Sequence, residues 1–189
     1  MAAFGLKMWG TVTGDAALVA RSNLQLAVLT RTLRNYYLYE DNNAVQPPNF
    51  IGNKVAGILF ENKIHHTTFF SADIEAIQGI QMIPVHGPTG LTRNKNFIQE
   101  EWDAFFGDGK IDNIDNPWKG IAYAQYALVD PVGSWEFFAS PSFQDSWIDG
   151  GASRSWFLAY AAGKSSSISN ESILSMALTV GSLIALGGA

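Results

Sequence analysis

Two helix-forming segments joined by a short glycine turn open the sequence, and they restrict the fold more than any other feature. Residues 2–12 are apolar and helix-compatible, but no Ser, Thr, Asp or Asn precedes them as a cap. Thr13, Gly14 and Asp15 favour a turn and a cap, and a long helix is expected from there to about Tyr39. Its buried face is predicted from helical spacing to carry Ala20, Leu24, Ala27 and Val28. Because the first segment lacks a cap, we expect the chain to be an incomplete piece of a larger helical domain.

Further helical segments alternate with long loops that are rich in Pro, Gly and aromatic residues. Helices are expected from Asp73 to Met82, Asn96 to Phe106, Lys119 to Leu128 and Gly150 to Ala162. Strand patterns are few and short, and Thr67 to Phe70 is one of them. Paired helices with long loops predict a mainly α toroid with a loop-lined cleft, since long loops in a compact domain usually carry function.

Composition excludes several classes of function. The chain has 189 residues, of which 47% are hydrophobic and 15% charged, as expected of one folded domain. The net charge is −5 and the Lys and Arg residues are scattered, so no nucleic-acid partner is expected. There is no cysteine, which excludes disulfides and Cys-based zinc sites. The first ten residues do not have the pattern of a signal peptide.

Carboxylates are the side chains to consider for acid and base chemistry. Glu75 lies between apolar residues in IEAIQGI and is the most informative single acid, with a buried hydrogen-bonding role as the alternative. Asp73, two residues earlier, does not share its helix face and is expected to be an N-cap. A solvated helix face is predicted for Glu100, Glu101 and Asp103.

Adjacent His65 and His66 do not form a metal-binding pattern. On an extended segment they point to opposite faces, and the only other histidine is His86. The Asp residues of residues 108–115 do not have the spacing of an EF-hand loop. No metal or other cofactor is therefore expected, and the two histidines are assigned either a structural role or hydrogen bonds to a substrate.

Aromatic residues in loops are suited to binding sugars, because pyranose rings have apolar faces that lie well on aromatic rings. Trp102 and Trp156 stand at helical positions, where packing in the core is favoured. For Trp118, Trp135 and Trp147 both roles stay open.

Several long motifs occur in an order found in one enzyme family. They are WGTVTGD at 9–15, HHTTFF at 65–70 within the longer stretch 38–93, FIQEEWDAFF at 97–106, KGIAYAQYALVDP at 119–131 and WIDGGASRSWFLAYAAG at 147–163. Together they make nearly all of residues 4–163 resemble glycoside hydrolase family 81, the endo-1,3-β-glucanases.

The resemblance implies a fold and an activity. It implies that residues 1–163 are the C-terminal portion of an (α/α)6 barrel, seen here as a partial barrel of helical hairpins with long loops and few short strands. Members of the family hydrolyse internal 1,3-β-glucosidic bonds with inversion, using an acid Asp and a base Glu on opposite sides of the bond. The implied partner is β-1,3-glucan, the implied location extracellular or in the cell wall, and the implied full-length protein a monomer.

The family's two catalytic carboxylates have no counterpart in the chain. Its base Glu lies in an acidic, Ser-rich motif just before the helix that corresponds to Phe4 to Gly10, and its acid Asp lies further upstream, so both are expected before Met1. What transfers is the lining of the cleft. The resemblance assigns substrate binding to His65, His66, Thr67, Asp73 and Glu75, while Asp149 and Arg154 are expected to pair as part of a structural loop.

Residues 164–189 match nothing in the family. They form a Ser-rich linker and an uncharged apolar tail, which suggests either a C-terminal anchor signal or a buried or disordered end. No other membrane association is expected. Two alternatives to an endo-1,3-β-glucanase fragment stay open: a non-catalytic glucan-binding or structural remnant of such an enzyme, and an unrelated helical domain anchored by its tail.

Overall fold

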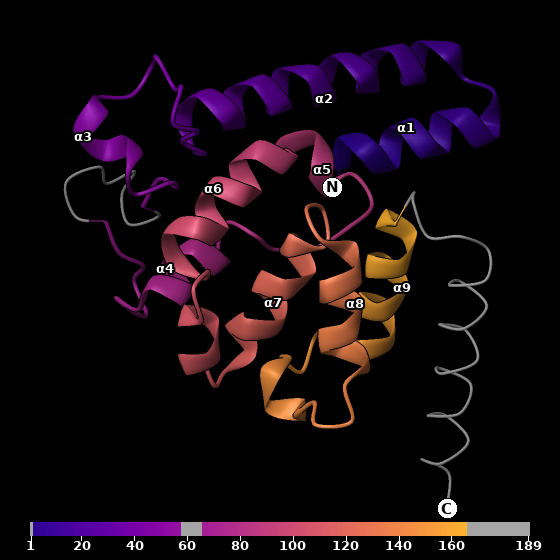
Figure 1. Cartoon of the computed structure of the whole chain (residues 1–189). Coiled ribbons are helices and arrows are strands. Elements are labelled where there is room, and N and C mark those ends of the chain that lie inside the picture. Colours follow the sequence, from indigo (N-terminus) through magenta and orange to yellow (C-terminus); the bar gives the residue numbers. More distant parts are fainter. Residues whose placement is uncertain (1, 58–65, 166–189) are drawn as a thin grey trace, which may run out of the picture. The chain divides into compact units, whose positions relative to one another are not determined.

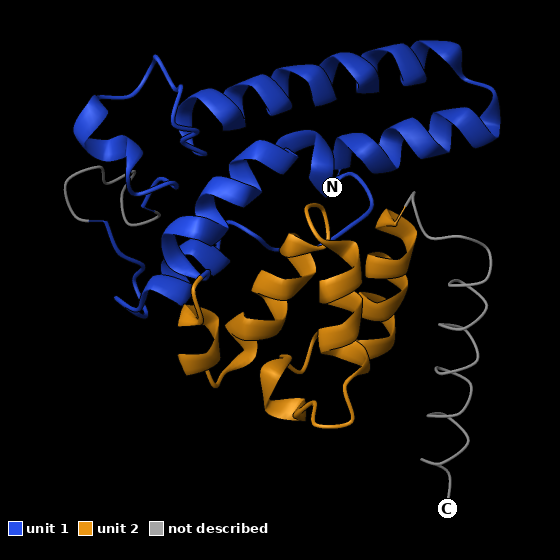
Figure 2. Ribbon diagram, in the orientation of Figure 1, with its two compact units in different colours: residues 1–107 blue, residues 108–189 orange. Residues whose placement is uncertain are grey.

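The structure is a computed structural model that describes residues 2–57 and 66–165 (Figure 1). Within these residues the chain is helical, and β pairing is limited to one antiparallel bridge between Leu38 and Val55. The predicted mainly α class is confirmed, whereas the arrangement as a partial barrel stays a prediction. The chain divides into two compact units, residues 1–107 and residues 108–189 (Figure 2).

Among its described residues, 2–57 and 66–107, unit 1 contains two long helices, one helix of intermediate length and three short ones. They are α1 (Ala2–Thr13), α2 (Ala16–Tyr36), α3 (Pro48–Ile51), α4 (Ile74–Gly79), α5 (Thr89–Thr92) and α6 (Lys95–Phe105). Long loops connect these helices, as predicted from the segments that are rich in Pro and Gly.

Helices α1 and α2 form the predicted hairpin. Gly14 adopts a φ of 73°, a left-handed conformation that suits glycine, and the Asp15 side chain caps α2 by accepting from the backbone N–H of Leu18 at 2.9 Å. A Cβ on Gly10 would lie 3.1 Å from the backbone oxygen of Asp15 and from Val19, so glycine lets the helices approach closely. The turn and the cap are therefore confirmed.

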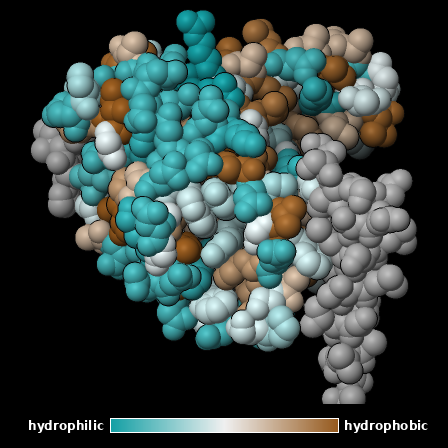
Figure 3. All heavy atoms as spheres, viewed as in Figure 1, coloured by the Kyte–Doolittle hydropathy of each residue, from teal (hydrophilic) through white to brown (hydrophobic). Residues whose placement is uncertain are grey.

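The predicted buried face of α2 is wrong. Its four members, Ala20, Leu24, Ala27 and Val28, are all exposed, Leu24 to 66%. The helix instead turns Ser22 inward, with Leu18 and Leu26 half-buried one turn to either side. The helix itself was predicted correctly, but the wrong side of it was assigned to the interior. Helical spacing identifies apolar stripes on a helix without showing which of them faces α1. Figure 3 shows apolar side chains along this hairpin.

Helix α6 also corrects an expectation. Its N-cap is Asn94, whose side chain accepts from the backbone N–H of Phe97 at 2.8 Å. Glu101, predicted to be solvated, is 1% exposed and forms an ion pair with the buried guanidinium of Arg93, which also lies 4.9 Å from the centre of the Phe97 ring. Burial raises the pKa of the Glu101 carboxyl, and the nearby positive charge of Arg93 opposes the rise. Asp103 is exposed, as expected.

In the described part of unit 2, residues 108–165, three helices and two short 3-10 turns pack around aromatic rings. The elements are η1 (Lys110–Asn113), α7 (Pro117–Tyr126), α8 (Pro131–Ala139), η2 (Asp145–Trp147) and α9 (Arg154–Lys164). Each of the three helices has a side-chain N-cap, from Asn116, Asp130 and Ser153. The predicted helix at 119–128 is confirmed as α7, and the last helix begins four residues later than expected because Ser153 caps it.

The rings of Tyr123 and Phe137 stack with their centroids 3.8 Å apart, and Phe137 also lies parallel to Trp147 at 5.5 Å. Trp147 thus belongs to the packing of this unit. Trp156, for which core packing was favoured, is 45% exposed on α9. Arg154 does not take Asp149 as its partner. Its guanidinium instead donates to the backbone oxygens of Phe138, at 2.6 Å, and Ser140, at 2.9 Å.

None of the helices among residues 2–57 and 66–165 has the length and apolar character needed to cross a bilayer. The predicted apolar tail lies beyond the described residues.

We expect the buried Arg93–Glu101 pair to behave as a coupled unit. Arg93→Met and Glu101→Leu should each lower the free energy of unfolding by about 3–5 kcal/mol, because each leaves a buried charge unpaired. The double variant should recover most of this loss, which a double-mutant cycle from urea unfolding would measure. Asp103→Asn, on the exposed side of the same helix, is the control and should change stability by less than about 0.5 kcal/mol. If the double variant instead lost as much stability as the two single variants together, the coupling would be contradicted.

Gly120 of α7 should not tolerate a side chain. A Cβ at this position would lie 2.2 Å from the backbone oxygen of Trp147, so Gly120→Ala should destabilise by about 1–3 kcal/mol through overpacking. A Cβ on Gly163 of α9 would meet nothing within 4 Å, and Gly163→Ala should be neutral or stabilising by up to about 1 kcal/mol. Thermal unfolding of the two variants compares them directly, and equal midpoints would refute the close approach.

Candidate functional site

Four of the five predicted substrate-binding residues lie on one continuous segment of unit 1. His66 and Thr67 precede a tight turn, whereas Asp73 and Glu75 follow it at the start of α4. His65 lies outside the described residues. The described part of the predicted set, His66, Thr67, Asp73 and Glu75, therefore flanks one turn of the chain.

Helix α4 gives this segment a fixed base. Residues 76–79 are buried. The Gln78 side-chain amide donates to the backbone oxygen of Asn53 at 2.9 Å, and that of Gln81 donates to the backbone oxygen of Ala56 at 3.1 Å. Because two side chains bind the backbone of the preceding loop, α4 is held in place although it is only six residues long.

The turn is closed by side-chain hydroxyl groups. Thr67 and Thr68 are buried, and the Thr67 hydroxyl donates to the backbone oxygen of Ser71 at 2.9 Å. The Thr68 hydroxyl donates to the same oxygen at 2.5 Å and accepts from the Ser71 N–H at 2.8 Å. The segment 67–70, expected to be extended, therefore bends at Phe69 and Phe70. Thr67 thus donates its hydroxyl hydrogen within the loop, and its predicted contact with the substrate stays a prediction.

Asp73 and Glu75 present the carboxylates of the segment. Asp73 occupies the N-cap position of α4 as predicted, but its side chain makes no cap hydrogen bond. It accepts instead from the Ser71 hydroxyl at 2.8 Å and is otherwise exposed. Glu75 is half-buried in the first turn of the helix. The segment therefore has two carboxylates, both hydrogen-bond acceptors, just beyond the turn.

His66 is half-buried, and burial lowers the pKa of its imidazole. The ring is therefore neutral near pH 7. Its Nε2 atom is buried and has no hydrogen-bond partner among the described residues. Because the Nε2 atom has no access to solvent, contact between His66 and a ligand stays a prediction.

Phe69 and Phe70 are the members of this segment that the sequence interpretation missed. They are 77% and 47% exposed at the tip of the turn, and their ring centroids are 5.0 Å apart with an interplanar angle of 81°. The pattern TTFF favours a strand, in which alternate side chains would be covered, so the exposure of both rings follows only from the turn.

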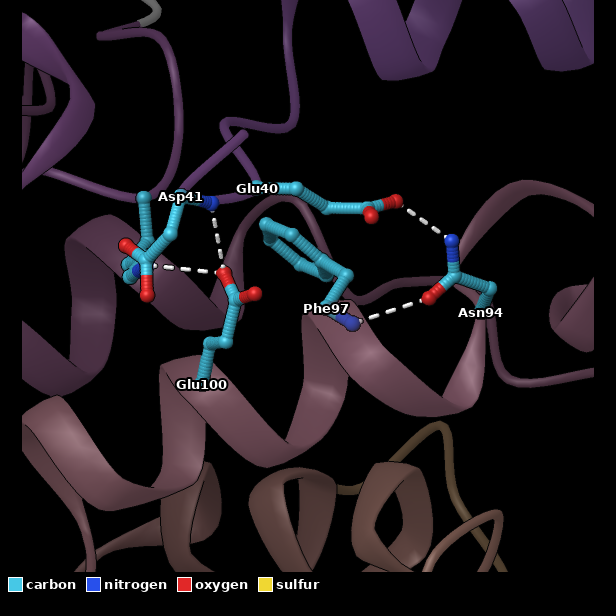
Figure 4. Close-up of polar contacts among 6 residues, drawn as sticks. Glu40, Asp41, Asn94, Phe97 and Glu100 are labelled. Carbon is cyan, nitrogen blue, oxygen red and sulfur yellow. Dashed lines mark hydrogen bonds and ion pairs between the residues drawn. The ribbon is translucent and has the colours of Figure 1, made fainter. Parts of the chain in front are cut away.

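A second polar cluster anchors the loop before α3 to helix α6. The buried ammonium of Lys54 binds the carboxylates of Asp41 and Glu100, and Glu100 also accepts from the backbone N–H of Asp41 at 2.8 Å (Figure 4). Burial alone would lower the pKa of Lys54, but the two carboxylates outweigh it and raise that pKa. Lys54 adopts a φ of 61°, which is uncommon for a residue other than glycine.

Asn94 links the same two elements. It caps α6 through its oxygen and donates from its amide nitrogen to Glu40 (Figure 4). Asp41 and Glu100, for their part, share one ammonium. They do not resemble the two carboxylates of a glycosidase, which need room between them for the substrate bond and, with inversion, a water molecule.

A groove of about 550 Å³ runs along α2. Its lining combines apolar side chains, such as Leu26 and Leu91, with Lys7, Asn23, Arg31 and Arg34. Its lining contains no carboxylate from the described residues, so it has no group for acid or base catalysis of glycoside cleavage. Among residues 2–57 and 66–165, moreover, no three His, Asp or Glu side chains come together as metal ligands would.

Comparison with known proteins identifies the family. The profile described as the glycosyl hydrolase family 81 C-terminal domain matches residues 1–158. A glucan endo-1,3-beta-D-glucosidase of Arthroderma benhamiae is 53% identical over 167 residues, which are 87% of this chain and 18% of the relative. Glucan endo-1,3-beta-D-glucosidase 2 of Saccharomyces cerevisiae is 44% identical over 84% of this chain and 20% of its own length.

The primary septum glucan endo-1,3-beta-D-glucosidase of Schizosaccharomyces pombe is 44% identical over 85% of this chain and 16% of the relative. The chain thus spans a fifth or less of the length of these curated relatives. Because the family profile covers most of the sequence, the chain belongs to glycosyl hydrolase family 81, within the C-terminal domain of that family.

Proposed function

We propose that the protein hydrolyses internal 1,3-β-glucosidic bonds of β-glucan with inversion, and that this chain supplies part of the wall of the substrate cleft. The observation that carries the proposal is family membership, together with relatives at 44–53% identity that are named glucan endo-1,3-beta-D-glucosidases. The acid Asp and the base Glu are provided by a part of the protein other than residues 1–163.

The structural roles of several carboxylates in this chain support the proposal that the catalytic acid and base lie elsewhere in the protein. Inverting hydrolysis needs an acid and a base about 6.5–9.5 Å apart, with a water molecule between the base and the sugar. Asp15 and Asp130 cap helices, Glu101 lies in a buried ion pair, and Glu100 and Asp41 bind Lys54. These five carboxylates stabilise the fold. Among the other acids of the chain, Asp73 and Glu75 are the two that the family resemblance assigns to substrate binding.

The segment 66–75 binds sugar hydroxyl groups in this proposal. Asp73 and Glu75 accept hydrogen bonds from hydroxyls in this proposal, and the neutral imidazole of His66 takes part through its exposed portion. His65 belongs to the same predicted set. Uncharged glucan requires neither a basic surface nor a cofactor, in keeping with the net charge of −5.

The same proposal places the protein outside the cell or in the cell wall, where the substrate is found, and makes the full-length protein a monomer. The relative from Schizosaccharomyces pombe carries the primary septum in its name, which supports a cell-wall substrate.

We expect the 189-residue chain to be retained on insoluble β-1,3-glucan without releasing reducing sugar from laminarin, and the full-length protein to release it. Asp73→Asn and Glu75→Gln should each weaken retention of the chain by about 5–10-fold, because each loses a charge-assisted hydrogen bond to a hydroxyl. Depletion of protein from solution by a glucan suspension measures retention, and a reducing-end assay measures turnover.

The matched control is Asp103→Asn, which removes an exposed carboxylate on α6 and should leave retention unchanged. Turnover by the chain alone that Glu75→Gln abolishes would contradict the division of labour and place a catalytic acid within the chain. Retention by a full-length protein that shows no turnover would instead favour a non-catalytic glucan-binding protein.

A further inference from the structure

We propose that Phe69 and Phe70 form an aromatic platform on which the pyranose rings of a β-1,3-glucan stack. The inference rests on the proposed function and adds a binding element that the candidate hydrogen-bonding residues do not include. Its basis is the presence of two exposed aromatic rings on a turn closed by hydrogen bonds, which Asp73 and Glu75 follow closely in the chain.

The first observation is the exposure and mutual geometry of the rings. Phe69 is 77% exposed and Phe70 47% exposed, although they are adjacent in the chain. Their rings meet edge to face at 81° with centroids 5.0 Å apart. A single exposed phenylalanine is ordinary, whereas two that order each other at one loop tip form a patch with a defined shape.

The second observation is that the turn beneath the rings is fixed. Ser71 accepts from the hydroxyls of Thr67 and Thr68 and from the backbone N–H of Thr68, and it donates its own N–H back to the Thr68 hydroxyl. The threonines are buried. A platform that is ordered before binding loses little conformational entropy when a ligand arrives, so contact with it contributes more affinity.

The chemistry of the ligand follows from these surroundings. In a β-linked glucose unit the axial positions carry hydrogen, so both faces of the ring are apolar while the hydroxyls project from its rim. The face of an aromatic ring stacks on such a sugar face, and hydrogen-bond acceptors near the aromatic ring bind the sugar hydroxyls. Asp73, exposed and two residues beyond Ser71, and Glu75 provide those acceptors. A platform with polar acceptors at its rim therefore fits a sugar better than a wholly apolar partner.

The test compares variants of the full 189-residue chain for binding of laminarihexaose by isothermal titration calorimetry. Phe69→Ala and Phe70→Ala should each weaken binding about 3–10-fold, and the double variant by more than about 10-fold. Phe69→Trp should bind at least as tightly as the unaltered chain. Phe69→Leu, which keeps apolar area but has no aromatic face, should be as weak as Phe69→Ala. Since the rings are exposed, the circular dichroism spectrum and the unfolding midpoint should not change.

The matched control is Tyr36→Ala, which removes an aromatic ring of similar exposure, 49%, at the end of α2 and should leave binding unchanged. Binding by the unaltered chain that the double variant retains within twofold would overturn the platform and leave the proposed function intact. Binding by Phe69→Leu equal to that of the unaltered chain would replace stacking by non-specific apolar contact and also overturn it. Absence of binding by the unaltered chain would overturn the platform together with the glucan-binding role on which it rests.

Discussion

Two adjacent carboxylates on helix α6 hold the long loops of unit 1. Glu100 binds Lys54 and the backbone of Asp41, and Glu101 forms a buried pair with Arg93. Successive helical residues point about 100° apart, so neighbouring acids can reach loops on two sides of one helix. In a unit with one isolated β bridge among its described residues, such side-chain contacts replace the ladder hydrogen bonds that would otherwise fix extended segments.

The candidate site depends on this anchoring through a chain of contacts. Lys54 fixes the loop after α3, and the backbone of Asn53 and Ala56 in that loop accepts the amides of Gln78 and Gln81. Those amides fix the far side of α4, whose first turn carries Glu75. The turn with Phe69 and Phe70 leads directly into this helix. Residues that contact no ligand thus determine where the side chains proposed to bind glucan lie.

Local sequence signals predicted the parts of the fold that depend on local physics. The turn at Gly14 and the cap at Asp15 are recognisable because a left-handed backbone and an unsatisfied helix N–H require particular residue types. The sequence did not predict hydrogen-bonding partners that lie outside the same helix or that are backbone atoms. The partner of Glu101 lies eight residues away before the helix, and Arg154 binds two backbone oxygens, which have no sequence signature.

The location of the candidate site stays a prediction from family resemblance, whereas the shape of its segment was not predictable from the sequence. Family resemblance pointed to residues 65–75, whereas their composition of threonine and phenylalanine favours an extended strand. The turn forms because buried threonine hydroxyls bind the Ser71 backbone, an outcome that requires a covered site for Thr67 and Thr68. That cover comes from tertiary packing, which a local pattern does not record. Once the hydroxyls are used inside the loop, its exposed side chains include two aromatic rings and the carboxylate of Asp73. A neutral polysaccharide is apolar on its ring faces and polar at its rim, and this combination of side chains matches both.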